Sequence, residues 1–253
     1  MEFHIRCDPQ DIARYCFTPG SPERAKKIAA QLEEARLVTD SRGYLVYSGK
    51  HAGIFMTVCA TNMGGPTAAI ALEELAHMGA ETFIRVGSCG VFKEGLGPGD
   101  IIISTGTYRA GGTSLAYLPL NFPAVPTFEV TLALREAAAE LGYAAYLGLG
   151  IAGDAFYAPR RQAEAEMLGE LVKAGIVSVE MESDTLYVVG AYRGWRTGAL
   201  FTSDGAPGQI KPEWGEAAFR EGEERSIQIA LRAMAKIARA DATPRPTTSS
   251  PPK

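Results

Sequence analysis

Features that would reveal a membrane or exported protein are missing from this sequence. No apolar run approaches the roughly 20 residues that a membrane-spanning helix requires. The first 15 residues are too polar to act as a signal peptide. We therefore expect a cytoplasmic protein without a membrane partner.

Cysteine and histidine are also scarce. The four cysteines (Cys7, Cys16, Cys59 and Cys89) show no CxxC spacing, and the three histidines do not cluster with them. This pattern argues against a zinc site and against a disulfide framework. We predict free thiols, no bound metal, and a packing role for Cys89, since no base accompanies it to activate a nucleophile.

The charge balance excludes another class of partner. Lysine and arginine together number 25 against 29 aspartates and glutamates, a net charge of -4. Such a chain has no basic excess with which to bind nucleic acid. With 253 residues, 46% of them hydrophobic, it can form one α/β domain with a substantial core. We place this domain at residues 1–239, and the Pro/Ser/Thr-rich segment 240–253 is predicted to be a disordered tail.

Apolar periodicity and turn residues divide the domain into alternating strands and helices. Strands are predicted at 44–48, 53–61, 82–86, 101–105, 146–151, 176–181 and 197–202. Helices are predicted at 22–34, 67–77, 129–141, 163–173, 184–193 and 214–239. This alternation indicates the α/β class.

The most informative stretch is 82–90, TFIRVGSCG. It predicts a buried strand that carries Arg85 and ends in a tight turn at Gly87-Ser88-Cys89-Gly90. A buried arginine is costly unless it meets an anion or a carboxylate. The backbone N–H groups and hydroxyl of the turn could serve the same anion. Two interpretations stay open: an oxyanion site, with phosphate as the expected anion, or an arginine salt-bridged inside the sheet.

A second candidate for anion binding precedes the first helix. Pro19-Gly20 forces a turn, Ser21 can cap the helix, and Pro22 suits its first position. The N–H of Gly20 and the side chain of Arg24 would then face an anion at the helix start. An ordinary capped helix is the other interpretation.

Polar side chains follow several of the predicted strands. The strand at 176–181 runs directly into Glu180-Met181-Glu182, where two acids have no evident structural need. Ligands of open α/β sheets bind at the carboxyl ends of strands. Stretches that are distant in sequence therefore point to one crevice through five side chains: Arg85, Ser88, Phe156, Glu182 and Asp204.

These residues carry a resemblance to a known family. Residues 3–238 are similar to the hexameric type of nucleoside phosphorylase, and most similar to its uridine branch. The matching motifs are PGSPERA at 19–25, NMGGPTAAIALEEL at 62–75, RVGSCG at 85–90, SLAYLPLNFPAVPTFEV at 114–130 and VSVEMES at 177–183. The resemblance implies a single domain with a twisted mixed central sheet flanked by helices.

The resemblance also implies roles for individual residues. Phosphate, a co-substrate rather than a cofactor, would be held by Gly20, Arg24, Arg85 and Ser88, with Arg42 from a neighbouring subunit. Ribose would lie against Met181 and Glu182, beside Glu180, with His4 reaching in from the neighbour. The base would stack on Phe156 near Cys89 and Gly90. Shared sites of this kind imply a homo-oligomer, by resemblance a hexamer built as a trimer of dimers.

The expected reaction is attack of phosphate on C1′ of uridine, with Arg85, Glu182 and Asp204 as the catalytic candidates. Phe156-Tyr157 is followed by Arg160 and then Gln162, the reverse of the order that usually reads uracil, and this pair is predicted to recognise the base or else to form a solvated loop. Asp204 resembles the aspartate that assists purine N7 in the purine branch, so inosine or adenosine is the alternative substrate; it can also be a turn aspartate. Gly43 replaces a cation-holding glutamate, and we predict no bound monovalent cation.

Overall fold

The computed structural model describes residues 2–157, 159, 161–209 and 212–243. Nine strands form one sheet in the order β2-β3-β4-β1-β5-β8-β7-β6-β9 within these residues. The strands are β1 Tyr15–Phe17, β2 Glu33–Ser41, β3 Tyr44–His51, β4 Ile54–Cys59, β5 Thr82–Val91, β6 Ile101–Ala110, β7 Tyr146–Gly153, β8 Ile176–Glu180 and β9 Arg196–Ser203. The helices are α1 Pro22–Ala29, α2 Gly65–His77, α3 Phe128–Glu140, α4 Gln162–Lys173, α5 Ser183–Arg193 and α6 Glu213–Ala242, with short 3₁₀ turns at Pro9–Asp11 and Thr113–Ala116.

Half of this sheet closes on itself. Strand β5 pairs in parallel with β9 and, at its far end, antiparallel with β8. Strands β8, β7 and β6 continue in parallel, and β6 returns to β9 in an antiparallel pairing. Strands β1, β4, β3 and β2 extend the sheet outward from the other side of β5. The predicted α/β class with a mixed, helix-flanked sheet is confirmed.

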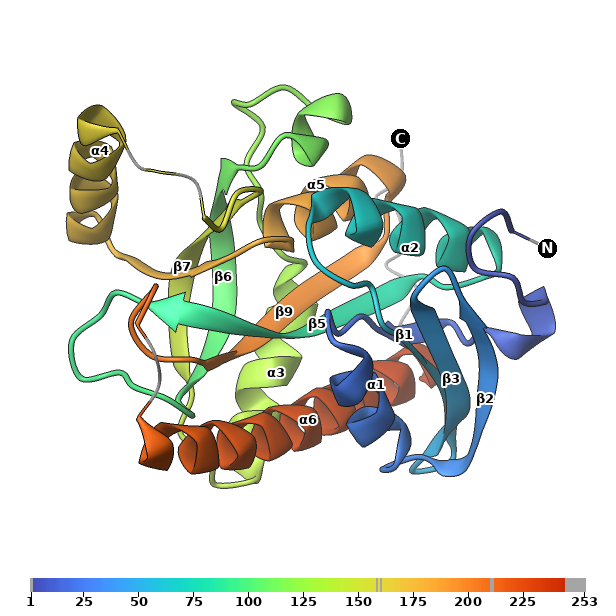
Figure 1. The fold of residues 1–253 in the computed structure, drawn as a ribbon. Coiled ribbons are helices and arrows are strands. Elements are labelled where there is room, and N and C mark those ends of the chain that lie inside the picture. The colour runs from blue at the N-terminus through green and yellow to red at the C-terminus, as the bar shows by residue number, and fades with distance from the viewer. Residues whose placement is uncertain (1, 158, 160, 210–211, 244–253) are drawn as a thin grey trace, which may run out of the picture.

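Helices cover both faces of the sheet. Helices α1, α3 and α6 lie on one face, and α2 and α5 lie on the other (Figure 1). Alternate side chains of β5 enter the two cores, since neighbouring residues of a strand point to opposite faces. Val86 packs with the α6 side, and Phe83 packs with Leu72 of α2 and Leu186 of α5. Helix α4 stands apart from both layers (Figure 1) and contains no fully buried residue.

Three sequence-based boundaries were wrong or incomplete. The helix predicted over 22–34 ends at Ala29, and residues Glu33–Ser41 form the strand β2. This strand is mostly exposed and pairs irregularly with β3, so its charged sequence lacks the alternation that marks a half-buried strand. Helix α6 continues to Ala242, so the predicted tail begins as helix; residues 244–253 lie outside the described residues.

The third correction concerns the turn predicted at 87–90. Strand β5 runs through these residues to Val91, with Ser88 paired to Thr202 and Gly90 paired to Val179. Strand β9 pairs with β5 from Thr82 to Cys89, and β8 pairs with Gly90 and Val91. The glycines therefore permit close packing where two strands meet, and do not form a tight anion-binding turn.

No helix in the described part of the chain combines the length and apolarity needed to cross a bilayer.

We expect Gly87→Ala to destabilise the sheet. A Cβ at Gly87 would lie 2.7 Å from Cδ1 of Phe201 on β9, which is too close for ordinary contact. Overpacking of this kind lowers the free energy of unfolding by about 1–3 kcal/mol. Thermal melting should place the variant below Gly97→Ala, the matched control, because nothing lies within 4 Å of a Cβ at Gly97. Equal melting temperatures would contradict the packing described for β5.

Candidate functional site

Arg85 is held by two carboxylates inside the protein. Only 5% of its surface is exposed. Its Nε donates to Glu180 at 3.2 Å and its Nη2 donates to Glu182. Burial alone would lower the pKa of Arg85, but the negative charges of Glu182 and Glu180 outweigh it and raise that pKa. The salt-bridged arginine foreseen as one interpretation is present, and its partners are the two acids that end β8.

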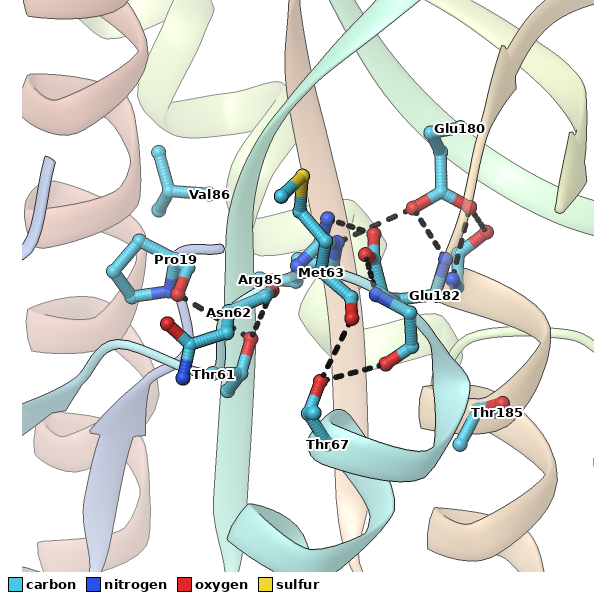
Figure 2. A network of polar contacts seen from close by, with 12 residues as sticks. Pro19, Thr61, Asn62, Met63, Thr67, Arg85, Val86, Glu180, Glu182 and Thr185 are labelled. Atoms are coloured by element: carbon cyan, nitrogen blue, oxygen red, sulfur yellow. Dashed lines mark hydrogen bonds and ion pairs between the residues drawn. The ribbon is translucent and has the colours of Figure 1, made fainter. Parts of the chain in front are cut away.

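The two acids occupy different structural positions. Glu180 is the last residue of β8, and Glu182 is the residue that precedes α5. Burial and the charge of Glu182 raise the pKa of Glu180, although Arg85 acts in the opposite direction. Glu182 also accepts a hydrogen bond from the backbone N–H of Gly64 at 2.5 Å. Figure 2 shows both carboxylates directed at Arg85.

A loop at residues 61–64 connects this pair to the Pro19-Gly20 turn. The N–H of Thr61 donates to the carbonyl of Pro19 at 2.8 Å, and Gly64 reaches Glu182 as above. A Cβ at Gly20 would lie 3.7 Å from both Nη1 and Nη2 of Arg85. Gly20, Arg85 and Glu182 therefore gather in one place. A small cavity there is lined by Thr18, Thr61, Ala68, Leu72, Arg85, Glu182 and Leu186.

Arg24 lies toward the opposite face of β5. Its Nε donates to Glu223 of α6 at 2.7 Å, and its Nη1 donates to the carbonyl of Val86 at 3.3 Å. Lys27 forms an ion pair with the same glutamate. By strand alternation Ser88 shares the face of Val86 rather than that of Arg85. The structure thus joins Gly20 to Arg85 directly, and it places Arg24 and Ser88 around the far side of the strand.

The residues predicted to read the base are spread out. Phe156 is 68% exposed, with its ring 4.9 Å from that of Tyr157. Gln162 begins α4 and donates to Glu166 of the same helix at 2.9 Å. Arg160 lies outside the described residues. Neither Phe156 nor Gln162 contacts Arg85, Glu180 or Glu182 through the interactions seen between described residues.

Cys89 and Gly90 are packed beneath the segment that follows β9. The carbonyl of Cys89 accepts the N–H of Asp204 at 2.8 Å. A Cβ at Gly90 would lie 2.9 Å from Cγ of Pro207. Cys89 is 3% exposed, and burial raises the pKa of its thiol well above the ordinary range. These contacts fit the predicted packing role and bring Asp204 to the end of β5.

His4 and Arg42 form a separate cluster on the surface. The Nδ1 of His4 lies 2.6 Å from Oε1 of Glu74, a buried residue of α2. The guanidinium of Arg42 lies 5.4 Å from the ring centre of Phe3, which also contacts His4. Hydrogen bonds from Ile5 and His4 outweigh the effect of burial and lower the pKa of Glu74. The structure brings His4 and Arg42 together, and their contacts among the described residues are not with Arg85 or Glu182.

Three residues that contact the predicted site residues were not predicted from the sequence: Gly64, Glu74 and Glu223. Gly64 lies in the glycine turn recognised at 62–66, but its N–H donation to Glu182 depends on a contact 118 residues away. Glu223 meets Arg24 across 199 residues. A buried position within an amphipathic helix pattern was the signal available for both glutamates, and that signal does not identify the partner.

Glu223→Gln tests the buried pair with Arg24. Burial raises the pKa of Glu223, but its bonds to Lys27 and Arg24 outweigh this and lower it below 4.5. Its stabilising effect is therefore complete above the unfolded-state pKa and is lost as pH falls through the folded-state pKa. Removing one partner of a buried ion pair costs up to about 3–5 kcal/mol.

The measurement is urea unfolding of wild type and variant from pH 7 downward. We expect the largest difference in free energy of unfolding at neutral pH and a shrinking difference below about pH 4.5. Glu221→Gln is the matched control, since this residue lies on the same helix with a 72% exposed side chain. A difference that does not change with pH would contradict the charge pairing.

Comparisons with known proteins identify the family of this chain. Residues 14–240 match the Phosphorylase superfamily. A uridine phosphorylase of Thermococcus kodakarensis is 38% identical, with 95% of this chain and 88% of that protein covered. A uridine phosphorylase of Treponema pallidum is also 38% identical, over 79% and 80% of the two chains. A guanosine phosphorylase of Halorubrum lacusprofundi is 32% identical, over 92% and 98%.

Proposed function

This chain belongs to the Phosphorylase superfamily, and from that premise we propose that it cleaves uridine with inorganic phosphate, giving uracil and ribose 1-phosphate. It is a nucleoside phosphorylase, a pentosyltransferase. The observation that carries the substrate assignment is the buried Arg85–Glu182 pair beside Gly20, together with similarity to several proteins named uridine phosphorylase. The reaction needs no cofactor in this proposal, and we assign it to the cytoplasm.

Phosphate is proposed to bind against Arg85 and the Gly20 backbone. A guanidinium offers two parallel N–H donors to a phosphate, a geometry that a lysine cannot supply. Among the described residues Arg85 Nη1 has no hydrogen-bond partner, and it lies on the Gly20 side. Ser88 and Arg24 would complete the clamp around the edge of β5 that β1 leaves unpaired beyond Ile84, once Arg24 exchanges part of its bonding with Glu223 for phosphate.

Ribose is proposed to lie over Met181 and Glu182. The sugar gains positive charge as the bond to the base breaks, and a carboxylate held nearby stabilises that charge. Glu182 can accept from the ribose hydroxyls while it remains bound to Arg85. Orienting phosphate in line with C1′ can contribute roughly 7–11 kcal/mol to catalysis. No covalent intermediate on the protein is required.

The base is proposed to leave between Phe156 and the floor formed by Cys89 and Gly90. Phe156 is exposed enough to stack on a ring. An arginine at position 160 would stabilise the uracil anion, and the amide of Gln162 would pair with the O4 and N3 edge. This requires Gln162 to leave Glu166, to which its side chain donates a hydrogen bond at 2.9 Å.

A purine nucleoside is the second candidate substrate. Asp204 reaches the end of β5 beside Cys89, where it could donate to N7 of a purine and let the base depart neutral. The similarity to a guanosine phosphorylase favours keeping this candidate. Uridine has no N7, so Asp204 would have no such role in the preferred reaction.

Release of free base from a panel of nucleosides separates the candidates. Uridine, inosine, adenosine and guanosine are each incubated with and without phosphate. We expect uracil release that requires phosphate and that survives Asp204→Asn within about threefold, because a loss of general acid catalysis costs about 100-fold or more. Release of hypoxanthine, adenine or guanine without release of uracil would show that the substrate is a purine nucleoside and not uridine. Release without phosphate would refute phosphorolysis.

Residues from a second subunit are proposed to complete each site. His4 would reach the ribose and Arg42 the phosphate of a neighbouring subunit. Both residues lie at the surface, and their contacts among the described residues are with Glu74 and Phe3 rather than with Arg85 or Glu182 of their own chain. Closed two-fold dimers make such exchange reciprocal. We propose a homo-oligomer, a hexamer arranged as a trimer of dimers.

Mixed oligomers test this arrangement. Arg42→Ala and Glu182→Gln should each abolish most activity, whereas co-expression of the two should restore it. Random pairing makes half of the dimers in a hexamer hybrid, and each hybrid dimer has one intact site of two, so about one quarter of wild-type activity should return. The measurement is phosphorolysis by doubly tagged hybrids purified through both tags. Hybrids that stay as inactive as the parents would show that Arg42 serves its own chain.

A further inference from the structure

The carboxylate of Glu180 is fully occupied by the protein itself. Its Oε1 accepts from the N–H of Ser183 at 2.9 Å and from the Ser183 hydroxyl at 2.6 Å. Its Oε2 accepts from the N–H of Glu182 at 3.0 Å and from Nε of Arg85 at 3.2 Å. Two oxygens with two donors each leave no acceptor position for a ribose hydroxyl. Its side chain is 3% exposed.

These four bonds fix two other groups relative to each other. The first N–H groups of α5 have no partner within the helix, and Glu180 supplies one. This sets the position of Glu182, which precedes the helix. The same carboxylate holds Arg85 by Nε, at the base of the guanidinium, and Nη2 bonds Glu182 (Figure 2). Both Nη1 and Nη2 lie 3.7 Å from the position of a Cβ at Gly20.

The register of the sheet explains why Glu180 can hold both Arg85 and the start of α5. Gly90 pairs with Val179 in the antiparallel contact of β5 with β8, so Glu180 arrives across from Cys89. Arg85 precedes Cys89 by four residues and shares its face by alternation. The end of β8 therefore delivers a carboxylate to the Nε of Arg85. Ser183 is itself anchored, since its hydroxyl lies 2.8 Å from that of Thr107 on β6.

We propose that Glu180 is a positioning residue that holds Arg85 and Glu182 in the geometry for phosphate and ribose, and that it does not bind ribose. The proposal rests on the proposed function of this site. It replaces the ribose contact that the family resemblance implied for Glu180. Loss of the carboxylate should disturb phosphate and nucleoside together, because one anchor serves both ligands.

Deoxynucleosides distinguish a positioning residue from a ribose ligand. We compare Glu180→Gln and Glu182→Gln on uridine, 2′-deoxyuridine and 3′-deoxyuridine at saturating phosphate, and we measure the KM for phosphate with uridine. Glutamine at 180 would point N–H donors at existing donors, so Arg85 should lose its fixed orientation. A misplacement of about 1 Å can cost on the order of 100-fold in rate.

For Glu180→Gln we expect the same fold loss in kcat/KM on all three nucleosides, and a KM for phosphate raised at least about tenfold. Glu182→Gln, two residues away, should lose far more on uridine than on the analogue that lacks the hydroxyl it binds. A loss for Glu180→Gln that shrinks on either deoxynucleoside would overturn the proposal, and so would an unchanged KM for phosphate.

A second variant covers the case in which Glu180→Gln does not fold. Glu180→Asp keeps the charge but is one methylene too short to reach both Arg85 and the start of α5. We expect a folded protein whose KM for phosphate rises several-fold, with equal losses on the three nucleosides. An unchanged KM for phosphate would overturn the proposal here too. Wild-type protein that releases no uracil would instead count against the proposed function.

Discussion

The site depends on one buried cation placed between two buried carboxylates. A buried arginine in the middle of β5 would be destabilising without partners. Arg85 is stable there because Glu180 and Glu182, at the end of β8, form ion pairs with it. The pairing of Gly90 and Val91 of β5 with the end of β8 creates this meeting. The pairing that closes half of the sheet therefore also places the two acids beside Arg85.

Charge balance explains why the site needs more than this cluster. With every carboxylate ionised, Arg85, Glu180 and Glu182 together carry one excess negative charge. Arg24, Lys27 and Glu223 carry one excess positive charge on the other face of β5. The two clusters together are neutral, so the site as a whole does not attract a phosphate anion strongly. An arginine from a neighbouring subunit would supply the missing positive charge, which gives a physical reason for a shared site.

The sequence predicted the parts of the site that are unusual for their local setting. Arg85 in an apolar strand and Glu180-Met181-Glu182 at a strand end were identified because such residues need partners. The pairing between them was not identifiable, because it depends on strand order and register. Strand β2 was missed because an exposed edge strand lacks apolar alternation, and 87–90 was misread because glycines that admit Phe201 resemble glycines that turn. Glu223 was beyond reach because its partner Arg24 is 199 residues away.

The phosphate dependence of an Arg85→Lys variant tests the central claim most directly. Lysine keeps the charge that Glu180 and Glu182 require, but it lacks the planar fork that can hold Glu180, Glu182 and phosphate at once. Initial rates of uracil release are measured against phosphate concentration, with melting temperature as the check on folding. A folded variant whose KM for phosphate rises by about tenfold or more is the predicted result. A folded variant with wild-type phosphate saturation would contradict the account.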